Sequence, residues 1–403
     1  MRKMKDSGVA WIGEMPEDWT VKRGKFTLKL LNRPVKETDD VITCFRDGEV
    51  TLRTNRRTDG FTVSVKEIGY QGIEPGDLVI HGMDGFAGSI GISDSRGKSS
   101  PVLVVCDTDE NKRYIMYYLR SMAYNDVFTA LATGIRVRSC DLRWNKLAEL
   151  PYILPSLEEQ NQIVLAIESS TSKVDALIAN VQAQIEKLKT YKQSLITEVV
   201  TKGLDPNVPM KDSGVEWIGK IPKHWNMIRF RFIAKITTGN QDTQNADPDG
   251  MYPFYVRSPI VDRCNNYTFE GKGILMAGDG AGAGRVFHLV NGKYAVHQRV
   301  YRFYDFKYMN PVLLKFYLEN LFATVMDYGS AKTTVPSVRL PMIQDFPVCV
   351  PPEDEQLKML EVLSEKTNKI DRFIAVKQTK IEKLEQYKRS LIYEYVTGKK
   401  EVS

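Results

Sequence analysis

The chain has 403 residues, of which 42% are hydrophobic and 26% are charged. This composition is typical of a folded protein with two or three domains and excludes a disordered or fibrous chain. No apolar run approaches the roughly 18 to 20 residues of a membrane span, and no signal-peptide core follows the first basic residues, so we expect a cytoplasmic protein. The net charge of +6 suits a polyanionic partner but is only a weak indication of one.

The first segment, MKDSGVAWIGEMPEDW at Met4–Trp19, is nearly repeated as MKDSGVEWIGKIPKHW at Met210–Trp225. A second pair follows, because IEKLKTYKQSLITEVVT at Ile185–Thr201 returns as IEKLEQYKRSLIYEYVT at Ile381–Thr397. Between these markers, Val21–Glu149 and Asn226–Asp345 share little. A repeat of about 200 residues is too long for a solenoid unit, so the sequence predicts a duplicated domain followed each time by a helix.

Both variable modules combine short β-rich runs with one helix. In the first, a glycine-punctuated hairpin is predicted at Gly76–Ile92, a strand at Val102–Cys106 and a helix at Arg113–Phe128. In the second, the corresponding predictions are a hairpin at Gly271–Phe287, strands in Lys293–Phe303 and a helix at Asn310–Met326. The fold class predicted from these elements is α+β.

A long helix is predicted from Glu158 and again from Glu353, because neither stretch contains an internal proline or glycine. Pro155 and Pro352 suit the helix starts, and Gly203 and Gly398 the ends. Spacing by four and three residues forms a coiled-coil seam in each helix, at Val174, Ile178, Val181, Ile185, Leu188, Lys192, Leu195 and Val199, and at Ile370, Ile374, Lys377, Ile381, Leu384, Lys388, Leu391 and Tyr395.

We expect the two helices to pack against each other in antiparallel orientation, since each compact module returns the chain to its starting side. About 30 packed residues would form a rod of roughly 45 Å. The stripe alone is equally compatible with a coiled coil that joins separate chains. The seam lysines weaken a purely apolar zipper and are expected to face solvent or another subunit.

Polar residues suited to contact bases or phosphates gather in the variable modules. The candidates in the first module are Arg46, Arg53, Arg56, Arg57, His81, Arg136 and Arg138. Those in the second are Gln241, Arg257, Arg263, Asn265, Asn266, Arg285, His297, Gln298, Arg299 and Lys332. For each one taken singly, a solvated charge or a local ion pair is the more common role.

The sequence gives little support for an enzyme or a metal site. The five cysteines, Cys44, Cys106, Cys140, Cys264 and Cys349, are far apart and are predicted to be buried, reduced thiols. Neither the Gly97-Lys98-Ser99 triplet nor the Gly278–Gly284 run matches a nucleotide-binding motif. The acidic groups Asp39-Asp40 and Glu353–Glu355 suit a polar loop and a helix start better than a magnesium site.

The whole arrangement resembles the specificity subunit of type I restriction-modification systems. The similarity rests on the G-V-x-W-I-G-x-x-P-x-x-W markers at Gly8–Trp19 and Gly214–Trp225, on Glu159-Gln160 and Glu355-Gln356 at the helix starts, and on the I-E-K-L-x-x-Y-K-x-S-L-I cores. It implies target recognition domains at 1–150 and 206–346, a central spacer helix at 151–205 and a distal helix at 347–403 that pairs with it, with a pseudo-twofold internal repeat.

The resemblance also implies a non-catalytic protein that recognises a bipartite target in double-stranded DNA. Two methyltransferase subunits would dock on it, and two restriction and translocation subunits would join the full complex. S-adenosylmethionine, ATP and magnesium would be held by those other subunits, and no cofactor by this chain. Exposed helix faces and Trp11, Trp19, Trp217 and Trp225 are candidate docking surfaces, although core packing is the more common role of tryptophan. A coiled-coil adaptor with two protein-binding modules is the alternative.

Overall fold

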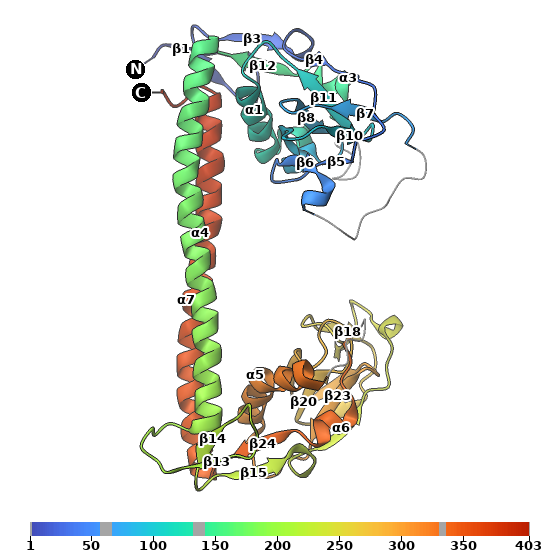
Figure 1. Cartoon of the computed structure of the whole chain (residues 1–403), viewed down its shortest axis with the longest axis vertical. Helices are drawn as coiled ribbons and strands as arrows, with labels where there is room; N and C mark the ends of the chain where they lie inside the picture. Colours follow the sequence, from blue (N-terminus) through green and yellow to red (C-terminus); the bar gives the residue numbers. More distant parts are fainter. Residues whose placement is uncertain (1, 57–66, 132–141, 330–335, 403) are drawn as a thin grey trace. The chain divides into compact units, whose positions relative to one another are not determined.

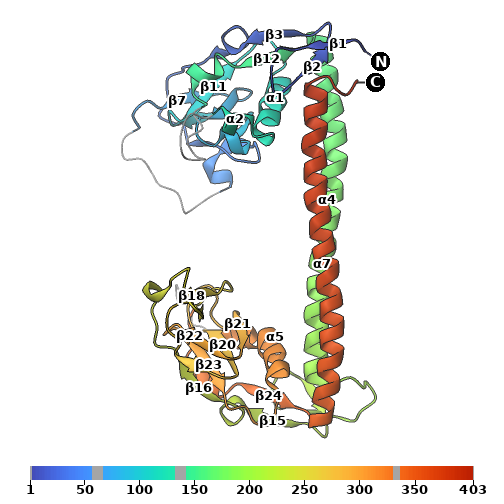
Figure 2. The same ribbon diagram turned by 180° about the vertical axis from the view of Figure 1, so that it is seen from behind.

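The computed structural model describes residues 2–56, 67–131, 142–329 and 336–402. The chain forms two compact units, of which unit 1 comprises Met1–Val181 and Thr379–Ser403, and unit 2 comprises Gln182–Gln378. Each unit therefore contains a globular part and one end of each long helix (Figure 1, Figure 2). Among the described residues, no helix has the length and apolar character needed to cross a membrane.

The long helices α4 (Leu157–Lys202) and α7 (Glu353–Val396) have the predicted starts and ends. Acidic residues occupy the first turn of each, where they favour the positive end of the helix dipole. Gly203 and Gly398, just after the two helices, have φ angles of +78° and +71°. This left-handed backbone suits glycine and ends a helix.

Within each unit, α4 and α7 lie side by side and run in opposite directions (Figure 1). In unit 2, Lys192 Nζ donates to Asp371 at 2.6 Å and Lys377 Nζ donates to Gln184 at 2.5 Å. In unit 1, Lys388 Nζ donates to Asp175 at 2.7 Å. Each of these lysines thus reaches a polar partner on the neighbouring helix, while the side chains of Lys192 and Lys388 remain 28% and 33% exposed.

The apolar seam residues are shielded from solvent. Those that are buried are Val174, Val181, Ile185, Leu195, Val199, Ile370, Ile381, Leu391 and Tyr395. Those of intermediate exposure are Ile178, Leu188, Ile374 and Leu384. The period-3.5 pattern thus identifies the sides of α4 and α7 that contact protein.

Unit 1 is built on a four-stranded antiparallel sheet in the order β4-β11-β8-β9. Its strands are β4 (Lys29–Leu30), β11 (Leu103–Asp107), β8 (Leu78–His81) and β9 (Ile90–Ile92). Helix α1 (Lys112–Tyr124) contributes Tyr114, Tyr118 and Leu119 to the core beneath it. The predicted hairpin is the β8-β9 pair, in which Val79 lies opposite Gly91. Smaller elements are α2 (Val127–Ala130), α3 (Trp144–Leu147), and the pairs β5 (Ile42–Cys44) with β6 (Val50–Leu52) and β7 (Gln71–Ile73) with β10 (Gly97–Ser99).

Unit 2 has an equivalent four-stranded sheet in the order β16-β23-β20-β21. Its strands are β16 (Lys235–Thr238), β23 (Val300–Tyr304), β20 (Gly273–Ala277) and β21 (Phe287–Val290), and helix α5 (Pro311–Gly329) packs on it. A second sheet, absent in this form from the described part of unit 1, has the order β18-β17-β22-β19. Its strands are β17 (Tyr252–Tyr255), β18 (Asp262–Cys264), β19 (Phe269–Glu270) and β22 (Lys293–Val296), and helix α6 (Leu340–Gln344) follows α5.

The duplicated markers fold alike. Each forms a short hairpin, β1 (Met4–Asp6) with β2 (Glu14–Pro16) and β13 (Met210–Asp212) with β14 (Lys220–Pro222). The strand after each marker pairs with the strand that precedes a long helix, β3 (Thr20–Arg23) with β12 (Pro151–Leu154) and β15 (Asn226–Arg229) with β24 (Pro347–Val350). The repeated sequence is therefore the part of each unit that joins the globular core to a helix start.

Candidate nucleic-acid interface

The second tryptophan of each marker fixes a helix start. Trp19 Nε1 donates to Glu159 at 3.1 Å, and Trp225 Nε1 donates to Glu355 at 2.9 Å. Both indoles are buried, at 1% and 0% exposure, so their role is packing within the unit. Trp11 and Trp217 are only partly buried against the same cores. The repetition of tryptophan in the markers and of glutamate at the helix starts thus has a structural reason.

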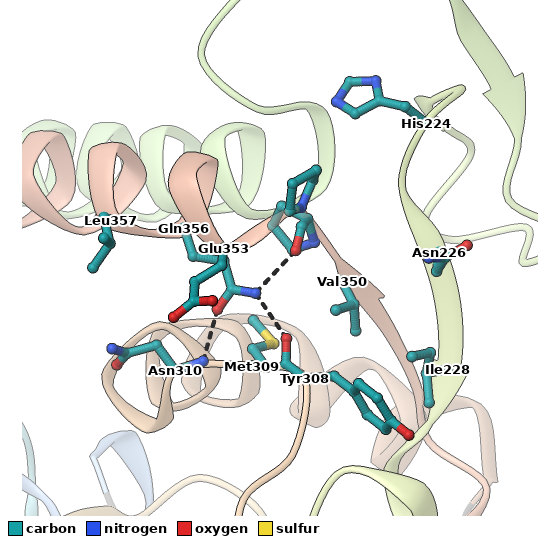
Figure 3. Close-up of a pocket in the computed structure, with 12 residues that line it drawn as sticks. His224, Asn226, Ile228, Tyr308, Met309, Asn310, Val350, Glu353, Gln356 and Leu357 are labelled. Atoms are coloured by element: carbon teal, nitrogen blue, oxygen red, sulfur yellow. Dashed lines mark hydrogen bonds between the residues drawn. The ribbon is translucent and has the colours of Figure 1, made fainter.

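The glutamine beside each of these glutamates ties the helix to the globular part. Gln356 Oε1 accepts from the backbone N–H of Asn310, and Gln356 Nε2 donates to the carbonyls of Tyr308 and Pro351 (Figure 3). Gln160 makes the corresponding bonds with Asn111 and Pro155. In unit 2 this junction borders a pocket of about 510 Å³ that Tyr308, Gln356 and Leu357 help to line.

In unit 2, five of the predicted candidates lie together at one end of the sheets, where loops leave β16, β17, β20 and β22. We call this surface the polar edge. Its residues are Gln241, Arg257, His297, Gln298 and Arg299. Gln241 is bridged to His297 through the backbone, and the N–H of Gln298 donates to the carbonyl of Gln241. The Arg257 and Arg299 side chains both reach Asp279, at 3.0 and 3.2 Å.

The two arginines present their charges to solvent, whereas the histidine between them does not. The Arg257 and Arg299 side chains are 44% and 63% exposed, and Gln298 is also exposed. His297 is 3% exposed, and its Nδ1 accepts from the backbone N–H of Arg299 at 3.0 Å. Burial, and then the nearby Arg257, lower the pKa of His297, which keeps the ring neutral. We conclude that His297 positions Arg299, and that the outer faces of the two arginines are available to a ligand. Gln298 is held at this surface by Asp242, which accepts from its Nε2 at 2.8 Å.

In unit 1, Arg46 and His81 are both bonded to Asp84, Arg46 through the carboxylate and His81 through the backbone N–H. Arg46 Nη2 donates to Asp84 at 3.1 Å, and the Arg46 side chain is 61% exposed. His81 Nδ1 accepts from the N–H groups of Met83 and Asp84, and burial lowers the pKa of His81. Each unit therefore has an exposed arginine held by an aspartate in the loop after its hairpin's first strand, next to a neutral histidine.

Other candidates in unit 1 lie in a different setting. Arg56 donates to both Asp47 and Glu49, and its guanidinium lies 4.2 Å from the centre of the Phe45 ring. Arg53, just after β6, donates to Thr43 of β5. The charge of Arg56 is thus balanced within the protein, which makes it a weaker ligand for phosphate than Arg46.

Three candidates in unit 2 hold their own loop together. Arg263 donates to the carbonyls of Gly250 and Met251, Asn265 donates to Asp247, and the Asn266 carbonyl accepts from Cys264. Arg285 is exposed and lies in the loop before β21. These residues belong to the β17-β18 region and the β20-β21 loop. Arg57, Arg136, Arg138 and Lys332 lie outside the described residues.

Asp84 and Asp279 were not among the residues predicted from the sequence. Each lies between two glycines just after a buried strand, in His81-Gly-Met-Asp-Gly and in Ala277-Gly-Asp-Gly. Glycines in this pattern indicate a turn, but the pattern does not show what the acidic residue between them binds. Only the fold shows that arginines from other loops converge on it.

The groups considered for catalysis and metal binding have structural partners. Arg96 lowers the pKa of Asp39 to about 2 by donating to its carboxylate, and the side chain of Asp39 is almost fully buried. Burial raises the pKa of Cys44 and Cys106 to about 12 and that of Cys349 to about 11, so these thiols are protonated. Cys264 is also buried, and Cys140 lies outside the described residues.

Comparison with known proteins finds similar sequences, some over part of the chain and some over most of it. The sequence profile of the type I restriction modification DNA specificity domain matches residues 222–386. The type I restriction enzyme EcoDI specificity subunit of Escherichia coli is 28% identical over 173 residues, which span 42% of this chain but only 35% of that protein. The putative type I restriction enzyme MjaX specificity subunit of Methanocaldococcus jannaschii is 23% identical over 96% of this chain and 95% of its own length.

A chain from a solved structure has a similar fold. That structure is described as the structural basis underlying complex assembly and conformational transition of the type I R-M system. The TM-score is 0.70 at 14% sequence identity, with 95% of this chain and 99% of that chain covered. The profile, the relatives and the duplicated markers agree: this chain is similar to the specificity subunits of type I restriction-modification systems.

Proposed function

We propose that this chain is the non-catalytic DNA-recognition subunit of a type I restriction-modification complex, and that each unit recognises one half of a bipartite, asymmetric target. The observation that carries the proposal is the recurrence, in two units with the same four-strand order, of an exposed arginine anchored by a loop aspartate beside a neutral histidine. The surrounding sequences differ between the units, as two different half-sites require.

The exposed groups suit base recognition in the major groove. An arginine can bond to O6 and N7 of guanine at once, and a glutamine can bond to N6 and N7 of adenine. Arg257, Arg299 and Gln298 supply these functions in unit 2, and Arg46 supplies the first in unit 1. Further arginines and lysines would contact phosphates, which fix the register but do not identify bases.

The helices would form an antiparallel coiled coil with a pseudo-twofold internal repeat, and would set the distance between the half-sites. In support, Asp175 and Asp371 occupy equivalent positions in the two copies, as do Lys192 and Lys388, and each aspartate is bonded to the other copy's lysine. The proposed functional segments are recognition domains at 1–150 and 206–346, and helical segments at 151–205 and 347–403.

The same helices would dock two methyltransferase subunits, and two restriction and translocation subunits would complete the assembly. Tyr191 and Tyr387 support this assignment, because they are identical in the repeated core yet are 56% and 55% exposed. A residue retained in both copies without burial has no packing reason to be aromatic. S-adenosylmethionine, ATP and magnesium would be held by the other subunits and none by this chain.

The function is tested by mapping adenine methylation in cells that express the methyltransferase subunit with and without this chain. A split, asymmetric methylated motif that requires the chain is the expected result. If the methyltransferase is active but no motif depends on the chain, the proposal fails and an adaptor for protein partners replaces it.

A further inference from the structure

We infer that Asp279 is a specificity-determining positioning residue, whose carboxylate orients Arg257 and Arg299 for one half-site and prevents them from binding phosphates indiscriminately. The inference rests on the proposed function and names the residue that controls selectivity at the polar edge of unit 2. Asp84 has the corresponding role for Arg46 in unit 1.

At Asp279, the two oxygens of one carboxylate bond to two different arginines, an arrangement that we call the fork. Oδ1 accepts from Arg257 Nη1 at 3.0 Å, and Oδ2 lies 3.2 Å from Arg299 Nη1. The carboxylate is 15% exposed, whereas the two arginine side chains are 44% and 63% exposed. One shielded anion therefore holds two cations whose outer faces remain open to solvent.

The backbone keeps this carboxylate in place. The N–H of Gly278 donates to the carbonyl of Arg299 at 2.9 Å, and its own carbonyl accepts from Val338 at 2.8 Å. On the other side, the N–H of Gly280 donates to the carbonyl of Pro336 at 3.0 Å. Because Asp279 is held on both sides, the arginines adjust to the aspartate and not the reverse.

Arg299 is restrained at a second point. Its backbone N–H donates to Nδ1 of the buried His297, which fixes the turn between β22 and β23 from which the side chain leaves. A guanidinium with a defined plane can form both bonds to one guanine edge, whereas a freely rotating guanidinium contacts any phosphate within reach. Asp279 thus lowers the affinity for DNA of any sequence and raises the discrimination between bases.

Removing the negative charge gives opposite changes in two measurable quantities. With Asp279→Asn, the edge gains one net positive charge, so non-specific DNA binding should strengthen and the slope of log K against log salt should steepen by up to about 0.9. Discrimination at the bases contacted by Arg257 and Arg299 should fall by roughly ten-fold per contact. A purely structural role would weaken both kinds of binding together.

The experiment uses the complex with methyltransferase subunits that carries wild-type chain, Asp279→Asn, Asp84→Asn or Asp249→Asn. Asp249 is an exposed aspartate of unit 2, so its variant has the same change of charge without the fork. Methylated motifs are mapped in cells, and binding to a specific and a scrambled duplex is titrated at several salt concentrations.

We expect Asp279→Asn to relax one half of the motif only, Asp84→Asn the other half, and Asp249→Asn neither. A motif unchanged by Asp279→Asn, or a loss of specific and scrambled binding alike, would overturn the inference. If the wild-type complex gives no chain-dependent motif, the proposed function itself has failed.

A second variant keeps the test valid if Asp279→Asn alters folding. In this variant, Asp279→Asn is added to a chain that already carries Arg257→Gln and Arg299→Gln. Because Asp279 acts through these two arginines, the added substitution should have no further effect on the half-site recognised by unit 2. A further relaxation of the motif in this background would show that Asp279 acts by another route.

Discussion

The bond network of Gln356 allows a stability prediction to be worked out from the structure. Gln356 is 4% exposed and makes three hydrogen bonds, to the N–H of Asn310 and the carbonyls of Tyr308 and Pro351. A neutral buried hydrogen bond contributes about 0.5–1.5 kcal/mol. Because water from the adjacent pocket can reach part of this network, we expect Gln356→Ala to lower the free energy of unfolding by about 2 kcal/mol rather than by the full sum.

For a cooperative unit of this size, that loss corresponds to a fall in Tm of about 4–8 °C. Calorimetry and urea unfolding of the full chain provide the measurement. The matched control is Gln378→Ala, since Gln378 is exposed on the same helix and in the same unit. A Gln356→Ala effect below about 0.5 kcal/mol, or one equal to that of the control, would refute the assignment of this glutamine as the tie between helix and domain.

Three further predictions concern the helices and the polar edge. Lys192→Asp or Asp371→Lys alone should destabilise unit 2 by up to about 1 kcal/mol, and the double exchange should restore it; a double variant no better than the singles would refute the pairing. Folding lowers the pKa of His297, so on acidification from pH 7.5 to 5.5 the unfolded chain takes up a proton more readily than the folded chain, and the free energy of unfolding should fall. His297→Gln should reduce this dependence of the free energy of unfolding on pH, and an unchanged dependence would contradict the reasoning. Tyr191→Ser with Tyr387→Ser should weaken methyltransferase binding about ten-fold or more while leaving Tm unchanged, as measured by calorimetric titration; a lower Tm with unaltered binding would indicate packing instead.

The helices and the shared frame were predictable because their signals are local. An uninterrupted run with a 3.5-residue period, flanked by proline and glycine, fixes both a helix and the side that it buries. The two hairpins were predictable for a similar reason, since each is closed within one short glycine-containing segment. The bonds of Lys192 and Lys388 could not be predicted, because their partners, Asp371 and Asp175, lie far away in the sequence.

The polar edge could be predicted only as a set of residue types. Sequence patterns gave arginines, histidines and glutamines, but the grouping depends on loops from separate strands that meet at one end of the sheets. Composition could not distinguish Arg299, which is open to solvent, from Arg263, which holds its own loop. Nor could it show that His297 is buried and acts on the backbone of its neighbour.

The central claim is that each unit recognises its own half of the target, and an exchange of one recognition segment tests it most directly. Residues 21–149 are replaced by the corresponding segment of another specificity subunit, and the methylated motif of the hybrid complex is mapped. We predict that one half-site changes, while the other half-site and the distance between the two half-sites are retained. A change in both half-sites, or in neither, would contradict it.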